Sequence, residues 1–175
     1  MSEEKNRRYL LYKVGDKIVY GENGACNVEA VGELSFSGAQ PGRKYYTLRP
    51  LAGSGTCFVP VDTTLFIRPV ISKKEALAFI DSIPSIEPAI CYDNRFNHVD
   101  AFYRELFKQH TNEALVSIIK GLRLRMTERK TKSGRIEATA KRAQDMLHGE
   151  LSIALGIEMK EVEQFITERL DGNPD

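Results

Sequence analysis

Long apolar runs, paired cysteines and catalytic motifs are all missing from this chain of 175 residues. No apolar run approaches the roughly 20 residues of a membrane-spanning helix, and residues 1–8 are charged where a signal peptide is apolar. We therefore expect no membrane contact and a cytoplasmic location. The three cysteines, Cys26, Cys57 and Cys91, form no CxxC pair, which argues against a disulfide scaffold and a zinc site.

The sequence also lacks the patterns by which most enzyme sites are recognised. It contains no GxGxxG, GxxxxGK[ST], GxSxG or HExxH motif. The histidines His98, His110 and His148 do not have the i, i+4 spacing that would place two imidazoles on one metal ion. We expect a protein without catalytic activity, metal or cofactor.

The net charge of +1 conceals an uneven distribution of charge. Residues 104–142 carry eleven Lys and Arg against four Asp and Glu, whereas residues 143–175 carry two against eight. A cluster of cations attracts phosphates, although solvated helix faces and helix dipoles explain part of it. The predicted phosphate-contacting edge consists of six residues: Lys120, Arg123, Arg129, Lys130, Lys132 and Arg135.

The first part of the chain reads as short β-strands divided by glycine and proline. Strands are expected at residues 16–20, 25–32, 44–49, 56–59 and 64–67. So many short strands within residues 9–70 predict a small barrel of the SH3-like or Tudor-like kind.

After Pro69 the apolar period becomes that of helices. Ser72 and Glu75 have the spacing of a capping box before a helix over residues 73–83, and prolines then end it. We expect a connecting helix and linker over residues 71–90. A separate all-α domain should follow over residues 91–171, with helices near 97–109 and 112–130, one after the Ser133-Gly134 break that carries Ile136 to Leu155, and a last one near 158–170. The predicted fold class is α+β with two domains, a small β-barrel followed by this helical domain.

Several short motifs resemble one bacterial family over residues 9–170. The first part contains YKVGDKIVY at 12–20, NGA at 23–25, VEAV at 28–31, YY at 45–46 and VP at 59–60. These motifs resemble the amino-terminal module of CarD/CdnL-type transcription regulators, which also occurs in the transcription-repair coupling factor. The segments 106–122, 131–134, 143–147 (AQDML), 149–151 (GEL) and 155–156 (LG) resemble the family's carboxy-terminal domain.

The resemblance implies a non-catalytic monomer that links RNA polymerase to promoter DNA. A Tudor-like module would bind the polymerase β subunit, and the helical domain would contact DNA at the upstream edge of the transcription bubble. In this family an aromatic residue, usually Trp, wedges into the minor groove and stabilises the open complex. An apolar wedge of this kind offsets the cost of unstacking a base step.

This chain contains no Trp, so another residue must take the place of the wedge. The corresponding region offers Tyr92 and Phe96 as aromatic candidates, with Arg95 between them as a phosphate or groove contact. The competing interpretation of Phe96 is that it packs in a helix core. A weaker or differently tuned effect on the open complex is expected.

The polymerase-binding surface is predicted on an exposed strand, because a sheet edge offers unpaired amides to another sheet. The resemblance places Leu34 in the second strand and Phe58 in the fourth, with Tyr46 and Val59 on the same module. Burial inside the barrel is the competing explanation for Leu34 and Phe58. The alternative function is a module that binds only protein. The absence of a salt-dependent affinity for DNA would favour this alternative.

Overall fold

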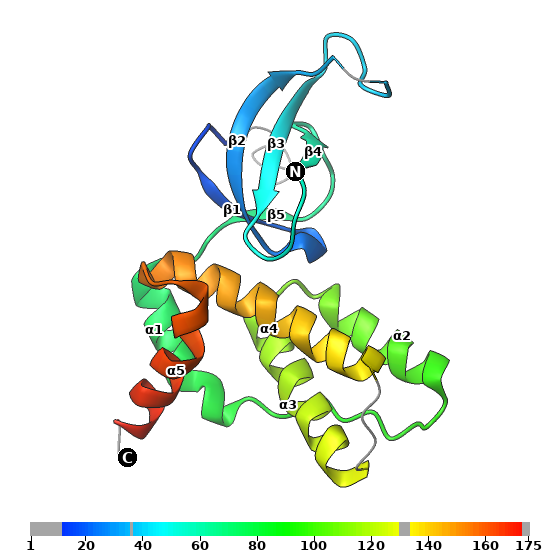
Figure 1. Ribbon diagram of the computed structural model, residues 1–175, viewed down its shortest axis with the longest axis vertical. Coiled ribbons are helices and arrows are strands. Elements are labelled where there is room, and N and C mark those ends of the chain that lie inside the picture. Colours follow the sequence, from blue (N-terminus) through cyan, green and yellow to red (C-terminus); the bar gives the residue numbers. More distant parts are fainter. Residues whose placement is uncertain (1–11, 36, 130–133, 173–175) are drawn as a thin grey trace, which may run out of the picture. The chain divides into compact units, whose positions relative to one another are not determined.

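The structure is a computed structural model that describes residues 12–35, 37–129 and 134–172. The chain divides into two compact units between Val70 and Ile71. We call the first the sheet unit and the second the helical unit, and each is described by itself (Figure 1).

The sheet unit is one antiparallel sheet of five strands with the order β4-β3-β2-β1-β5. No pairing joins β4 to β5 in the part of the chain that the structure describes, so the sheet is open. The strands confirm the α+β class, whereas a closed Tudor-like barrel is not confirmed. Their bounds are β1 Lys17–Tyr20, β2 Ala25–Glu33, β3 Lys44–Pro50, β4 Cys57–Pro60 and β5 Ile67–Pro69.

The last strand lies further along the chain than its composition predicts. Residues 64–67 contain the β-prone sequence, but β5 begins only at Ile67 because its register is set by β1, where Tyr20 pairs with Ile67. Pro69 is tolerated there because β5 is an edge strand. Gly24, with φ of 69°, ends the 3-10 turn η2 (Gly21–Asn23) between β1 and β2, as its place in a turn requires.

One face of the sheet carries the core of this unit. The core residues are Tyr12, Ile18, Cys26, Val28, Tyr46, Leu48 and Val59. The backbone amide of Tyr12 donates a hydrogen bond to the hydroxyl of Tyr46 at 3.1 Å, so this buried phenol is satisfied.

The helical unit contains five α-helices among its described residues, close to their predicted positions. Their bounds are α1 Lys73–Ser82, α2 Phe96–Phe107, α3 Asn112–Arg129, α4 Gly134–Leu155 and α5 Val162–Asp171. The 3-10 turns η3 (Ile83–Ser85) and η4 (Met159–Glu161) follow α1 and precede α5. Gly156, with φ of 72°, ends α4 as predicted. None of the helices in the described ranges is long and apolar enough to span a bilayer.

Helix α1 belongs to the core of the helical unit. Its capping box is present, with Ser72 and Glu75 bonded to each other's backbone amides. Ala76 and Ile80 are fully buried in the core that α2, α3 and α4 also share. The predicted connector 71–90 is therefore part of the helical unit, because its apolar face is buried against the other helices.

Candidate nucleic-acid interface and sheet surface

The segment that follows α1 is bound along helix α3 by polar contacts. We call residues 83–93 the strap. The ammonium of Lys120 donates to the carbonyl oxygens of Ile83 and Ile86, both at 2.7 Å. The hydroxyl of Ser117 donates to the carbonyl of Glu87. These contacts hold the first half of the strap against α3.

In its middle the strap touches the backbone of α3. The amide of Ala89 donates to the carbonyl of Ser117 at 2.9 Å, and the hydroxyl of Tyr103 donates to the carbonyl of Ala89 at 3.1 Å. Burial raises the pKa of Tyr103, which keeps this phenol protonated as a donor. A Cβ on Gly121 would lie 1.9 Å from the carbonyl oxygen of Ala89, so only glycine fits at this crossing.

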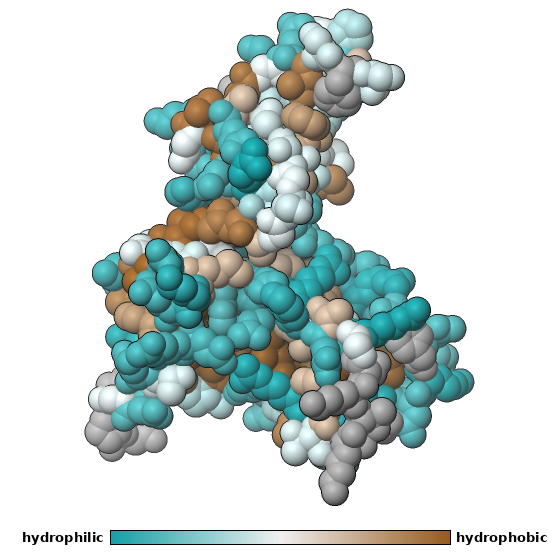
Figure 2. All heavy atoms as spheres, viewed as in Figure 1, coloured by the Kyte–Doolittle hydropathy of each residue, from teal (hydrophilic) through white to brown (hydrophobic). Residues whose placement is uncertain are grey.

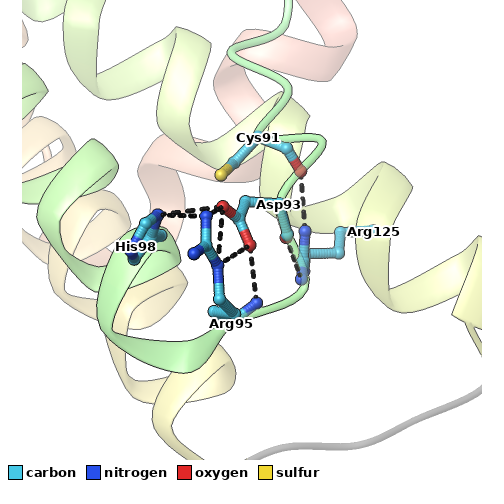
Figure 3. A network of polar contacts seen from close by, with 5 residues as sticks. All are labelled: Cys91, Asp93, Arg95, His98 and Arg125. Atoms are coloured by element: carbon cyan, nitrogen blue, oxygen red, sulfur yellow. Dashed lines mark hydrogen bonds and ion pairs between the residues drawn. The ribbon is translucent and has the colours of Figure 1, made fainter.

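The guanidinium of Arg125 binds the end of the strap through two hydrogen bonds. Its Nη1 donates to the carbonyl of Cys91 at 2.7 Å and its Nη2 donates to the carbonyl of Asp93 at 3.1 Å (Figure 3). The residue between these two carbonyls is Tyr92, whose exposed fraction is 85%. The chain on both sides of this aromatic residue is thus fixed, while its side chain extends into solvent.

The carboxylate of Asp93 fixes the start of α2. It accepts hydrogen bonds from the backbone amide of Arg95 at 2.8 Å and from the guanidinium of Arg95 at 2.7 Å. Its Oδ2 also lies 2.9 Å from Nδ1 of His98 (Figure 3). The hydrogen bonds from Arg95 are the main cause that lowers the pKa of Asp93 far below its usual range, so this carboxylate is charged at neutral pH.

The predicted wedge residues lie in or beside this network. Tyr92 is in the exposed loop, and Arg95 immediately precedes α2 with its side chain 71% exposed and paired with Asp93. Phe96 is the first residue of α2, and its side chain lies outside the described part of the structure. Tyr92 and Arg95 thus lie three residues apart on the segment that leads into α2.

The predicted basic edge is only partly available to a partner. Lys120 is committed to strap carbonyls, so its assignment as a phosphate contact is replaced by a structural role. Arg123 is exposed and reaches the carboxylate of Glu163 at 3.3 Å. Arg135 is exposed near the start of α4. The side chain of Arg129 and the residues Lys130 and Lys132 lie outside the described part of the chain.

Sequence reasoning missed the residues of α3 that bind the strap. Ser117, Gly121 and Arg125 recur every four residues and therefore lie on one face of the helix. This spacing aligns a short hydroxyl side chain, a glycine without a side chain and a long guanidinium side chain along the helix. It was a usable signal that something passes closely over that face.

On the face opposite its core, the sheet unit presents a row of side chains that ends in the exposed ring of Phe58. The register pairs Ala30 with Thr47 and Thr47 with Phe58, so their side chains lie side by side. Phe58 is 47% exposed and lies on β4, at one end of the strand order. Next to this row runs a polar one, in which Arg49 pairs with Glu29 at 2.5 Å.

The other predicted polymerase-binding residues lie elsewhere. Leu34 is half-buried and follows the last residue of β2 rather than lying in the strand. Tyr46 and Val59 are each only 2% exposed, because their side chains point to the core face. Their contribution to a surface is limited to holding β3 and β4 in place.

Exposed large apolar residues occur in both units of the described chain. On the face seen in Figure 2, hydrophilic residues cover most of the helical unit, and hydrophobic residues are visible at several places on the sheet unit. By exposed fraction, Phe58 and Leu65 are among the exposed large hydrophobic residues of the sheet unit, and Tyr92 in the helical unit is the most exposed of the described chain.

A comparison with known families finds a match over the described part of the sheet unit. Residues 12–71 match the family model described as the CarD-like/TRCF RID domain. The helical unit from Ser72 onward lies beyond the matched residues, so the role of the candidate nucleic-acid interface is a proposal.

Proposed function

We propose that this chain, which carries a CarD-like RNA polymerase interaction domain at residues 12–71, links RNA polymerase to promoter DNA and modulates the open complex. The domain family is an interaction family of transcription factors and not a catalytic one. In the proposal the sheet unit binds the β subunit, the helical unit binds DNA at the edge of the bubble, and the protein acts as a cytoplasmic monomer. The observation that carries it is Tyr92, an aromatic residue 85% exposed on a fixed loop.

The polymerase contact is proposed on the β4 side of the sheet unit. The outer edge of β4 is not covered by another described strand, so its backbone can extend a partner's sheet. Phe58 supplies apolar area beside that edge, and the ion pair of Arg49 with Glu29 supplies a polar rim.

A charge at Phe58 tests this surface. The Phe58→Glu variant should reduce co-purification with the polymerase β subunit, because an exposed apolar contact becomes a desolvated carboxylate. Leu65→Glu is the matched control, since Leu65 is 60% exposed in the same unit, just before β5 at the opposite edge of the sheet. Equal binding by wild type and Phe58→Glu would place the contact elsewhere.

The promoter contact is proposed on the loop that carries Tyr92. Inserting an apolar side chain between base steps costs a few kcal/mol of unstacking, which stacking on the aromatic ring and cations on nearby phosphates offset. A phenol is smaller than an indole, so its stabilisation of the bubble should be weaker. Arg95 lies three residues away, where a guanidinium can reach the sugar-phosphate backbone.

Lifetimes of the promoter open complex test the wedge directly. Tyr92→Ala and Phe96→Ala should be compared with wild type after a competitor is added. Loss of a stacking contact worth about 1 kcal/mol shortens the lifetime about fivefold. Tyr92→Trp, which enlarges the ring, should lengthen it. Unchanged lifetimes in all three variants would refute the wedge.

A second function, a module that binds only protein, is favoured by one observation. Lys120 and Arg123 of the predicted basic edge are engaged within the chain, which reduces the charge available for phosphates. The affinity of residues 71–175 for duplex DNA as a function of salt separates the two functions, since phosphate contacts impose a steep negative slope. Absence of salt-dependent binding would favour the protein-only module.

A further inference from the structure

We infer that Arg125 is a positioning residue for loop 91–95, holding Tyr92 in the orientation in which it meets DNA; this rests on the proposed function of that loop. Arg125 itself is half-buried and lies on α3, while the loop comprises the last three residues of the strap and the two residues that join it to α2. It acts on the aromatic residue through the backbone on either side of it.

The geometry of the clamp suits an arginine. The two accepting carbonyls belong to Cys91 and Asp93, and they are bonded by different nitrogens of the same guanidinium. A planar fork with five donors can bond both acceptors at once, whereas a lysine ammonium is one compact donor group. The Nε of Arg125 is buried and has no hydrogen-bond partner within the described residues, so the group is drawn into the strap away from solvent.

Asp93 joins this clamp to a second one. Its main-chain carbonyl accepts from Arg125, and its carboxylate accepts from the amide and guanidinium of Arg95 (Figure 3). One residue thus ties the loop both to α3 and to Arg95, the residue that precedes α2. With both ends fixed, Tyr92 can reach a DNA groove without first ordering its backbone, a step that costs about 1–2 kcal/mol per residue.

The matched experiment uses two arginine-to-lysine variants of the full chain. Arg125→Lys keeps the charge but replaces the two separate donor nitrogens of the fork with one ammonium on a shorter side chain. Arg104→Lys is the control, because Arg104 is an exposed arginine of α2 paired with Asp100 one turn away. Circular dichroism identifies any variant that fails to fold, and Arg125→Met then supplies a second test of the same clamp without the charge.

The first readout is the motion of the Tyr92 amide, measured as an NMR order parameter. Wild type and Arg104→Lys should give a value near that of rigid backbone, about 0.85, and Arg125→Lys a value below about 0.6. Equal order parameters in the three proteins would overturn the inference, whatever the loop does on DNA.

The second readout is a double-mutant cycle on open-complex lifetime. Arg125→Lys should shorten the lifetime about as much as the combined Tyr92→Ala and Phe96→Ala change, and should add nothing in that background. If Arg125→Lys shortens the lifetime by the same factor in the variant that already carries Tyr92→Ala and Phe96→Ala, the inference is overturned. Arg125 would then contact DNA itself. If the aromatic changes leave the lifetime unaltered while Arg125→Lys mobilises the loop, the wedge function fails and the positioning role stands.

Discussion

A single methyl group on Gly121 should displace the strap from helix α3. In Gly121→Ala the new Cβ would lie 1.9 Å from the carbonyl oxygen of Ala89 and 2.6 Å from its carbonyl carbon, against an ordinary contact of 3.4 Å or more. The atoms that it meets belong to the backbone, so no side-chain rotation relieves the clash. The strap must therefore move away by about 1.5 Å, the difference between 3.4 and 1.9 Å.

This displacement breaks the hydrogen bonds at the crossing. The bonds from Ala89 to Ser117 and from Tyr103 to Ala89 are 2.9 and 3.1 Å long and would exceed hydrogen-bond range. Two lost hydrogen bonds cost about 1 kcal/mol each, and overpacking costs about 1–3 kcal/mol more. The better helix propensity of alanine returns about 1 kcal/mol. We expect the free energy of unfolding of the helical unit to fall by about 2–4 kcal/mol.

Urea denaturation followed by the helical circular dichroism signal measures this change. The matched control is Gly134→Ala, because a Cβ on Gly134 meets nothing within 4 Å and this residue begins α4. That variant should be unchanged or more stable by up to about 1 kcal/mol. If Gly121→Ala unfolds at the same urea concentration as wild type, the close crossing of strap and helix is wrong.

Three further predictions concern separate features of the chain. Ser72→Ala removes the side-chain half of the capping box on α1 and should lower the free energy of unfolding by about 1 kcal/mol in the same urea assay; an unchanged midpoint would show that the cap is unimportant. Burial raises the pKa of the Cys26 thiol to about 12, so at about pH 8 iodoacetamide should modify the half-buried Cys57 and Cys91 first, as mass spectrometry can show; early modification of Cys26 would contradict its burial. Because the pKa of Asp93 is lowered on folding, its contribution to stability is complete above its unfolded value of about 3.9 and is lost only as the pH falls through the folded value. Hydrogen exchange at the Arg95 amide, corrected for its intrinsic rate, should then be the same at about pH 7 and pH 5 and faster in Asp93→Asn; a strong change over that range would mean another group controls the loop.

The local signals of the sequence predicted most secondary structure correctly. The capping box of Ser72 and Glu75 and the glycine stop at Gly156 are interactions within a few residues, so the sequence alone contains them. The position of β5 depends instead on pairing with β1, a contact between distant segments. The burial of Tyr46 and the exposure of Phe58 also depend on which face of the sheet is covered, which alternation alone does not decide.

The candidate site was harder to predict, because its key groups act on backbone atoms. Lys120 was counted as a phosphate contact since it belongs to a basic block, yet it bonds carbonyls of residues more than 30 positions earlier. Arg125 belongs to the same block and has the same kind of partner. Charge counting treats all these cations alike, whereas the path of the strap determines which of them remain available to a ligand.

Under the proposed function, the clamped strap bears on how a chain without tryptophan would affect an open promoter. The net effect of a wedge is the stacking gained, less the cost of unstacking and the cost of ordering the wedge. Tyrosine gains less stacking than tryptophan, since its ring is smaller. The hydrogen bonds of Arg125 and Asp93 lower the cost of ordering the wedge, since the backbone around Tyr92 is fixed before any DNA is bound. It follows that Tyr92→Trp and Arg125→Lys should move the open-complex lifetime in opposite directions, and that tightening this loop can compensate for a smaller aromatic ring.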